Sequence, residues 1–170
     1  MGSLDVESLF TNVPLHETIN IILDYTYRHD TIPPPKIKEN TLKEALTLCT
    51  STCPFSTYDG KIYMQKDGVS MGCVLGPTFA NFYMGHLENR VLNNYKPYIY
   101  CRYMDDIFIS SDDKNCLEII KRMFEQKSVL KFTTEDSINE EINFLDCEIK
   151  IIDNSFHTSV QTKDTKVSAP

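Results

Sequence analysis

The chain has 170 residues, enough for one domain with a sizeable hydrophobic core. Hydrophobic residues make up 41% of it, and no apolar run approaches the roughly 18 residues of a membrane-spanning helix. We therefore expect a globular domain with no membrane partner. The formal net charge of −7 argues against a nucleic-acid-binding surface, unless the acidic residues gather around bound cations.

The six cysteines include no C-x-x-C pair, and the four histidines show no metal-ligand spacing. This pattern is typical of free thiols in a reducing compartment, and it predicts an intracellular protein. Residues 1–3 look like a start codon followed by an expression scar. We expect the native domain to span residues 4–162 and residues 163–170 to form a frayed tail.

Hydrophobic periodicity and turn signals predict the following elements. The expected order is a strand over 3–10, a turn over 11–14, helices over 15–28 and 41–50, hairpin strands over 55–58 and 61–65, a long helix over 77–93, strands over 98–103 and 107–110, a helix over 114–126, a strand over 129–133, a solvated acidic loop over 135–141, and a hairpin over 142–152 and 155–162.

The spacing of apolar residues predicts which helix faces are buried. In the long helix this face consists of Phe79, Ala80, Tyr83, Met84, Leu87 and Val91; in the later helix it consists of Leu117, Ile120 and Phe124. Helices mixed with antiparallel strand pairs predict an α+β domain, with an antiparallel sheet and helices packed on one of its faces.

Two adjacent acids, Asp105 and Asp106, lie at a tight turn between two predicted strands. Partly buried anions need a cation or hydrogen-bond donors nearby. Adjacent side chains on extended backbone point in different directions, so we choose Asp105 as the primary ligand. Asp5, in an apolar strand, is the candidate second acid. Together these acids could bridge two Mg²⁺ (or Mn²⁺) ions about 4 Å apart.

Five segments in chain order resemble the polymerase motifs of reverse transcriptases. They are Asp5 to Phe10 (motif A), Gly68 to Pro77 (motif B), Tyr103 to Asp106 (motif C), Leu130 to Glu135 (motif D) and Asn143 to Asp146 (motif E, the primer grip). The segments Ser8 to Pro14, Met71-Gly72 and Phe144 to Asp146 are most similar to those of Penelope-like retroelements.

The resemblance implies a polymerase palm with a ferredoxin-like core, which performs two-metal transfer of deoxynucleotides onto a primer 3′-hydroxyl. The roles it implies are catalysis by Asp5, Asp105 and Asp106, metal binding by Asp5, Val6, Asp105 and Asp106, nucleotide binding by Phe10, Met71 and Gly72, and primer gripping by Phe144, Leu145 and Asp146. The implied partners are an RNA template, a DNA primer and deoxynucleoside triphosphates, and the full-length element would act in the nucleus.

Some positions depart from the family pattern. Gly76 stands where serine usually precedes proline, and no lysine closely follows Glu135, so the general acid stays unassigned, with Lys131 a weak substitute. We interpret Lys61, Arg102 and Lys131 as solvated charges. We expect the fingers upstream and a thumb downstream to be absent. An isolated palm would then be inactive or weakly active, and its exposed sheet edges predict self-association.

Three alternatives stay open. Phe10 is either a gate against the ribose 2′-hydroxyl or an ordinary core residue. The whole chain is either an active palm or a catalytically silent, retroelement-derived palm that serves as a nucleic-acid-binding or structural module. A nucleotide cyclase also uses two metals on a palm, but it lacks a counterpart of Gly68 to Pro77 and of the primer grip.

Overall fold

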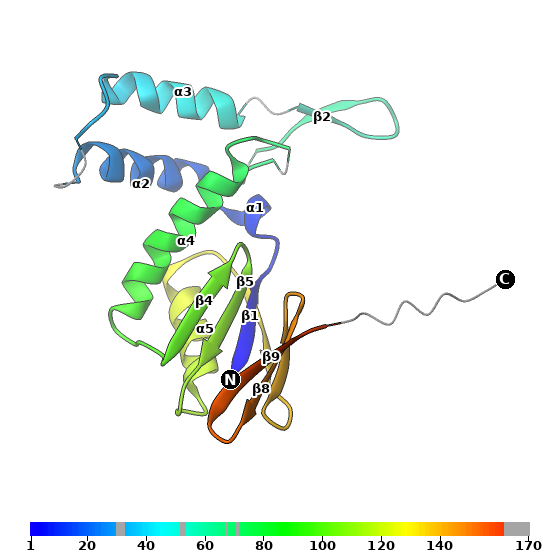
Figure 1. The fold of residues 1–170 in the computed structure, drawn as a ribbon. Helices are drawn as coiled ribbons and strands as arrows, with labels where there is room; N and C mark the ends of the chain where they lie inside the picture. The colour runs from blue at the N-terminus through cyan, green and yellow to red at the C-terminus, as the bar shows by residue number, and fades with distance from the viewer. Residues whose placement is uncertain (30–32, 52–53, 67, 71, 162–170) are drawn as a thin grey trace.

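The computed structural model describes residues 1–29, 33–51, 54–66, 68–70 and 72–161. Four strands, β1 (Gly2–Val6), β4 (Ile99–Tyr103), β5 (Asp106–Ser110) and β6 (Phe132–Asp136), form an antiparallel sheet in the order β4-β5-β1-β6. Helices α4 (Gly76–Leu92) and α5 (Cys116–Lys127) cover one face of it (Figure 1). Together these elements form the strand–helix–strand–strand–helix–strand unit of a ferredoxin-like core. The predicted α+β class is confirmed.

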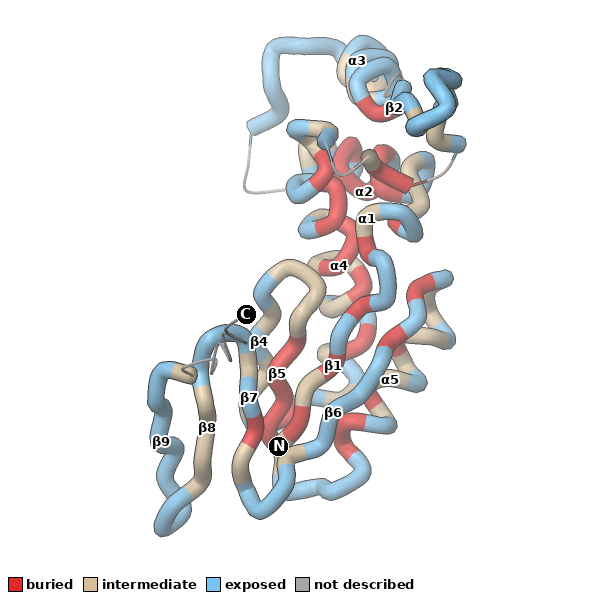
Figure 2. Tube along the Cα trace, turned by 90° about the vertical axis from the view of Figure 1, so that its right-hand side faces the viewer, coloured by how far each residue is buried: buried red, intermediate tan, exposed pale blue. Residues whose placement is uncertain are grey.

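Side-chain alternation in β1 separates the two faces of the sheet. Leu4 and Val6 are buried toward the helices, whereas Asp5 between them is exposed on the other face. The predicted inward faces of both helices are buried as expected, and Phe124 stacks on Phe132 with ring centroids 5.1 Å apart. Figure 2 shows the buried residues concentrated along β5, β1 and α4 and continuing into α2, whose Ile19, Ile22 and Leu23 belong to the same core. The core therefore lies between the helices and the sheet.

Five elements lie between β1 and α4 in the sequence. They are α1 (Leu9–Asn12), α2 (Leu15–Tyr27), α3 (Glu39–Ser51), β2 (Pro54–Ser56) and β3 (Ile62–Met64). Figure 1 shows that α2, α3 and β2 extend beyond the end of the sheet where α1 lies. The amide of Val69 donates a 2.7 Å hydrogen bond to the carbonyl of Phe10, so the chain returns to α1 before it enters α4.

A separate three-stranded meander follows the core. It consists of β7 (Glu141–Phe144), β8 (Cys147–Ile152) and β9 (Ser155–Val160), and every residue of β9 is exposed. The ring of Phe144 lies 5.6 Å from that of Phe108. Phe108 pairs with Ser3 and points away from the helices, so the meander lies against the sheet face that the helices leave open (Figure 2).

Three sequence-based predictions of elements were wrong in their bounds. The strand expected over 3–10 ends at Val6, because Ser8 adopts a left-handed conformation with φ of 50° and a helical turn follows. The strand expected over 129–133 begins at Phe132 and takes in part of the predicted acidic loop. The strand expected over 142–152 is two strands, divided at Leu145 with φ of 56°.

Gly2 and Ser3, interpreted above as an expression scar, pair with Ile109 and Phe108 within β1. In the parts of the chain that the structure describes, no helix combines the length and apolar character needed to cross a membrane.

Candidate active site

A row of four directly opposed residues crosses the open face of the sheet. Tyr103 in β4 is paired with Asp106 in β5, Asp106 with Asp5 in β1, and Asp5 with Thr133 in β6. Directly opposed residues in an antiparallel sheet hold their side chains on the same face, with Cβ atoms about 5 Å apart. The fold therefore brings two motif acids, a hundred residues apart in the sequence, side by side.

The third acid, Asp105, lies in the two-residue turn that joins β4 to β5. The first residue of this turn, Met104, is left-handed with φ of 56°, a conformation typical of tight hairpins but costly for a side chain other than glycine. The amide of Val6 donates a 3.1 Å hydrogen bond to the carbonyl of Asp105. The turn is thus attached directly to β1, beside Asp5.

The three carboxylates interact unfavourably when all are ionised. Although Asp5 reaches solvent, desolvation by its neighbours raises its pKa, and the charges of Asp105 and Glu7 raise it further. Desolvation also raises the pKa of Asp106, followed by repulsion from Asp105 and Asp5. Like charges held opposite one another destabilise a sheet. A cation that binds near the cluster relieves this repulsion and so stabilises the folded chain.

The arrangement suits a divalent ion that takes only one or two ligands from the protein and the rest from water and phosphate. Over the described ranges, no three or more His, Cys, Asp or Glu residues are grouped closely enough to enclose a metal ion. Mg²⁺, however, is commonly held by one or two carboxylates, with water and phosphate completing the shell. The facing Asp5 and Asp106 match that requirement. Val6, also expected in the metal site, could contribute only its carbonyl oxygen, because its side chain is buried and apolar.

The acids open onto a cavity of about 410 Å³ between the sheet and the meander. Its lining residues are Ser3, Asp5, Asp106, Thr133, Thr134, Glu135, Asn143, Phe144 and Leu145. Two of the three predicted motif acids and two of the three predicted primer-grip residues thus line one cavity, whereas Asp105 and Asp146 do not. The sequence favours Asp105 as the primary ligand, but Asp106 is the residue that lies opposite Asp5 and lines the cavity.

Phe10 and Gly72, like Asp146, do not line this cavity. Phe10 is half-buried in α1 and packs against the core. Gly72 is exposed with open space around it, and Met71 lies outside the described residues. Asp146 is exposed, and its carbonyl accepts a 2.9 Å hydrogen bond from the amide of Gln161.

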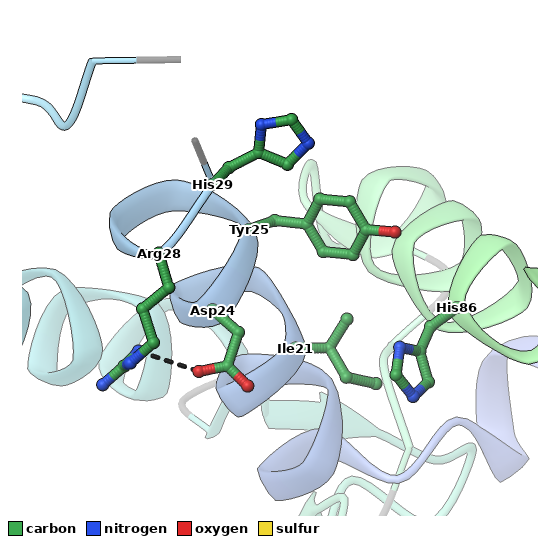
Figure 3. Close-up of a pocket in the computed structure, with 6 residues that line it drawn as sticks. All are labelled: Ile21, Asp24, Tyr25, Arg28, His29 and His86. Carbon is green, nitrogen blue, oxygen red and sulfur yellow. Dashed lines mark hydrogen bonds and ion pairs between the residues drawn. The ribbon is translucent and has the colours of Figure 1, made fainter. Parts of the chain in front are cut away.

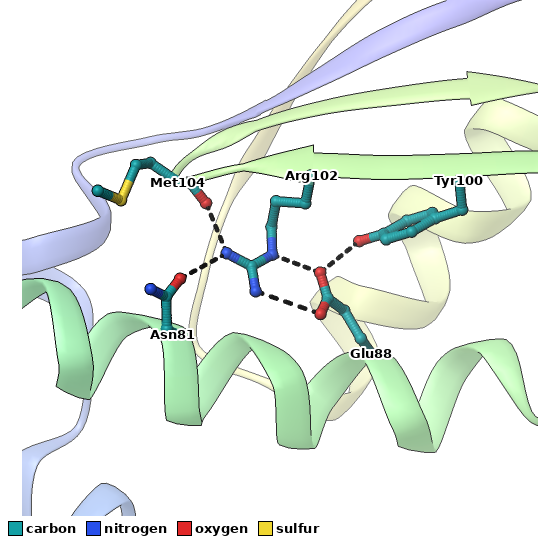
Figure 4. A network of polar contacts seen from close by, with 5 residues as sticks. All are labelled: Asn81, Glu88, Tyr100, Arg102 and Met104. Carbon is teal, nitrogen blue, oxygen red and sulfur yellow. Dashed lines mark hydrogen bonds and ion pairs between the residues drawn. The ribbon is translucent and has the colours of Figure 1, made fainter.

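The interpretation of Arg102 as a solvated charge was wrong. Only 13% of its side chain is exposed, and its guanidinium donates to Glu88, Asn81 and the carbonyl of Met104 (Figure 4). The register between β4 and β5 accounts for this burial. Arg102 is paired with the buried Ile107, so both side chains lie on the sheet face that the helices cover.

A second cavity, of about 390 Å³, lies on the outer surface of α2 and α4 (Figure 3). It is lined by Ile21, Asp24, Tyr25, Arg28, His29 and His86. Arg28 forms 2.8 Å ion pairs with Asp24 and with Glu39. None of the motif residues lines this cavity, so it is separate from the carboxylate site.

Comparison with known proteins finds similarity to telomerases, both in sequence and in fold. A telomerase reverse transcriptase from Oryza sativa subsp. japonica is 32% identical over 37% of this chain, which covers 6% of that protein. A structure of apo telomerase from Candida tropicalis, truncated from the C-terminal domain, matches with a TM-score of 0.67 at 16% identity, over 93% of this chain and 35% of that one.

A telomerase from Candida albicans, solved with the TWJ fragment of telomeric RNA, matches with a TM-score of 0.70 at 11% identity, over 95% of this chain and 30% of that one. At these identities the solved structures show the fold alone. The chain thus spans about a third of the length of these solved chains. The family model for reverse transcriptase (RNA-dependent DNA polymerase) matches residues 1–135. This chain therefore belongs to the reverse transcriptase family, and its fold is that of a polymerase-type palm.

Proposed function

We propose that the chain is the catalytic palm of an RNA-directed DNA polymerase, which adds deoxynucleotides to a primer 3′-hydroxyl opposite an RNA template. The observation that supports the proposal is the 410 Å³ cavity, which is lined both by Asp5 and Asp106 and by Phe144 and Leu145, two residues of the expected primer grip. A primer end that lies between these two groups would present its hydroxyl to the carboxylates. Such positioning is the main contribution a protein makes to phosphoryl transfer.

In this proposal Asp5 and Asp106 hold the divalent ions, and Asp105 adds negative charge from the adjoining turn. Mg²⁺ or Mn²⁺, when bound, would activate the attacking hydroxyl and stabilise the charge on the triphosphate. Repulsion among the three acids favours loading of the site. Phe144, packed against Phe108 at 5.6 Å, provides a rigid apolar wall for the primer.

The finer assignments rest on the sequence motifs. We infer a Penelope-like retroelement origin, with action in the nucleus, from the sequence segments Ser8 to Pro14, Met71-Gly72 and Phe144 to Asp146. Phe10, five residues after Asp5, would select deoxynucleotides, while Met71 and Gly72 would support the incoming nucleotide. Asp146, which is exposed, would complete the primer grip.

Titration of Mn²⁺ followed by calorimetry tests the proposal directly. We expect the parent chain to bind Mn²⁺, and Asp5→Asn and Asp106→Asn each to weaken the affinity about tenfold or more, because each removes a charged ligand. Asp153→Asn is the matched control, since this exposed acid lies in the β8–β9 turn with φ of 50°, which asparagine tolerates.

A second titration, with a deoxynucleoside triphosphate present, shows whether the metal arrives together with phosphate. If neither titration shows binding that depends on Asp5 and Asp106, the proposed catalytic role is wrong.

A catalytically silent palm is the second candidate. It is favoured by the lack, in the described part of the chain, of a ready-made group of three metal ligands. The net charge of −7 favours the version of it that is a structural module and binds no nucleic acid. A silent nucleic-acid-binding module would bind primer–template without divalent ions and with a steep salt dependence. An active palm would require divalent ions both to bind the primer–template and to extend the primer.

A further inference from the structure

We propose that Arg102 is a positioning residue that fixes the turn carrying Asp105 and leading into Asp106. The inference rests on the proposed metal-binding role of these acids. The Arg102 network consists of Arg102, its three hydrogen-bond partners Asn81, Glu88 and Met104, and Tyr100, which bonds to Glu88 (Figure 4). It joins the middle of α4 to the β4–β5 turn across the buried face of the sheet.

The anchor of this network is the ion pair between Arg102 and Glu88. Nε of Arg102 donates to Oε1 of Glu88, and Nη2 donates to Oε2 at 3.3 Å. Only 13% and 16% of the two side chains are exposed, so water competes weakly for the contact. The hydroxyl of Tyr100 donates a 2.8 Å hydrogen bond to the same carboxylate. Burial and the charge of Glu88 raise the pKa of Tyr100 well above its usual value, so it remains a donor.

The remaining nitrogen of the guanidinium reaches the turn itself. Nη1 donates to the carbonyl of Met104 and to Oδ1 of Asn81, each at 3.0 Å. The Met104 carbonyl belongs to the peptide group that precedes Asp105, and Met104 is the residue held at φ of 56°. Arg102 therefore fixes the peptide plane at the point where the strained backbone turns toward the acids.

The turn is held from its other side by β1. The carbonyl of Asp105 accepts the amide of Val6 at 3.1 Å, one residue from Asp5. Asp105 is thus bracketed: the peptide before it is bonded to the α4 network, and its own carbonyl is bonded to the strand of the facing acid. A guanidinium suits this position because its planar fork serves Glu88, Asn81 and Met104 together, which a lysine ammonium cannot do.

Hydrogen exchange at single amides separates positioning from general stability. In Arg102→Lys, which keeps the charge, we expect the Val6 amide to exchange about tenfold faster while other amides of β1 and β5 change little, because only the turn loosens. Asn81→Ala removes one acceptor at an exposed helix position and should give a smaller change at the same amide. Arg122→Lys, in the exposed pair with Glu118, is the control and should change nothing.

A uniform acceleration across the sheet in Arg102→Lys, or no change at Val6 in either variant, would overturn the inference. Calorimetric titration of Mn²⁺ into the same proteins tests whether a loosened turn also weakens metal binding. Where the parent binds Mn²⁺, Arg102→Lys should lower the affinity about tenfold. An unchanged affinity in a protein with a loosened turn contradicts the positioning role. If the parent binds no Mn²⁺ even with a deoxynucleoside triphosphate present, the proposed function fails, and the Val6 amide alone decides whether Arg102 fixes the turn.

Discussion

The three acids of the site can be identified from their local sequence context, whereas their arrangement relative to one another cannot. Adjacent aspartates at a predicted turn, together with Asp5 in a strand, pointed to Asp105 and Asp106 as site candidates. Which of these two acids lies opposite Asp5 depends on the register between β1 and β5. The local sequence does not determine this register, so the Asp5–Asp106 pairing could not be predicted from it. Arg102 was missed for the same reason, because its partners Glu88 and Asn81 lie on a helix that only the tertiary fold brings near.

Removal of one of these charges should stabilise the metal-free chain. The pKa of Asp106 is raised in the fold, so the folded state binds its proton more tightly than the unfolded state does, and stability falls as the pH rises through the folded pKa. At pH 7 we expect Asp106→Asn to increase the free energy of unfolding by about 0.5 kcal/mol, allowing for solvent screening.

This gain should shrink as the pH falls through the raised pKa of Asp106, and it should vanish below the ordinary aspartate value. Urea denaturation at a series of pH values, with divalent ions chelated, measures it. Asp153→Asn is again the control. A gain that persists into acid would show that repulsion between ionised acids is not its cause.

At the scale of elements, amphipathic helices were predicted well and strand ends poorly. The buried faces of α4 and α5 follow from a 3.6-residue period sustained over several turns. The end of β1 depends on one left-handed residue, Ser8, which alternation of apolar residues does not reveal. Leu9 and Phe10 fit a strand or a helix equally well in such a short segment, and the local turn decided between them.

The junction between α1 and the segment before α4 depends on Gly68. This residue has φ of +73°, and a Cβ atom there would overlap the backbone of Thr11. We expect Gly68→Ala to lower the free energy of unfolding by about 2–4 kcal/mol, from left-handed strain plus steric overlap. Gly72→Ala is the matched control, because no atom lies within 4 Å of its Cβ position. Denaturant unfolding of both variants measures the difference, and equal stabilities would contradict this account of the junction.

At the scale of the whole molecule, the meander leaves an unpaired edge. Strand β9 (Ser155–Val160) is exposed throughout, carries no formal charge and, among the described residues, pairs with β8 alone. Uncharged free edges favour pairing between chains. We expect light scattering to show a mass that rises with protein concentration, and Val160→Lys to reduce that rise, because charge on an edge strand opposes association. A parent mass that stays monomeric at all concentrations would remove this expectation.

The return of the chain to α1 has a consequence for how related sequences can vary in length. The chain leaves the sheet at α1, and it returns at Gly68 and Val69, which contact Thr11 and Phe10. Between these points α2 packs on α4 and buries Ile19, Ile22 and Leu23 in the core. Entry and exit therefore share one anchoring point. Because the entropy of closing a loop grows slowly, with about 0.6 kcal/mol for each doubling, insertions or deletions in the exposed β2–β3 hairpin should leave the alignment of β1 with α4 intact. Lineages could lengthen or shorten this hairpin independently while the acids keep their geometry.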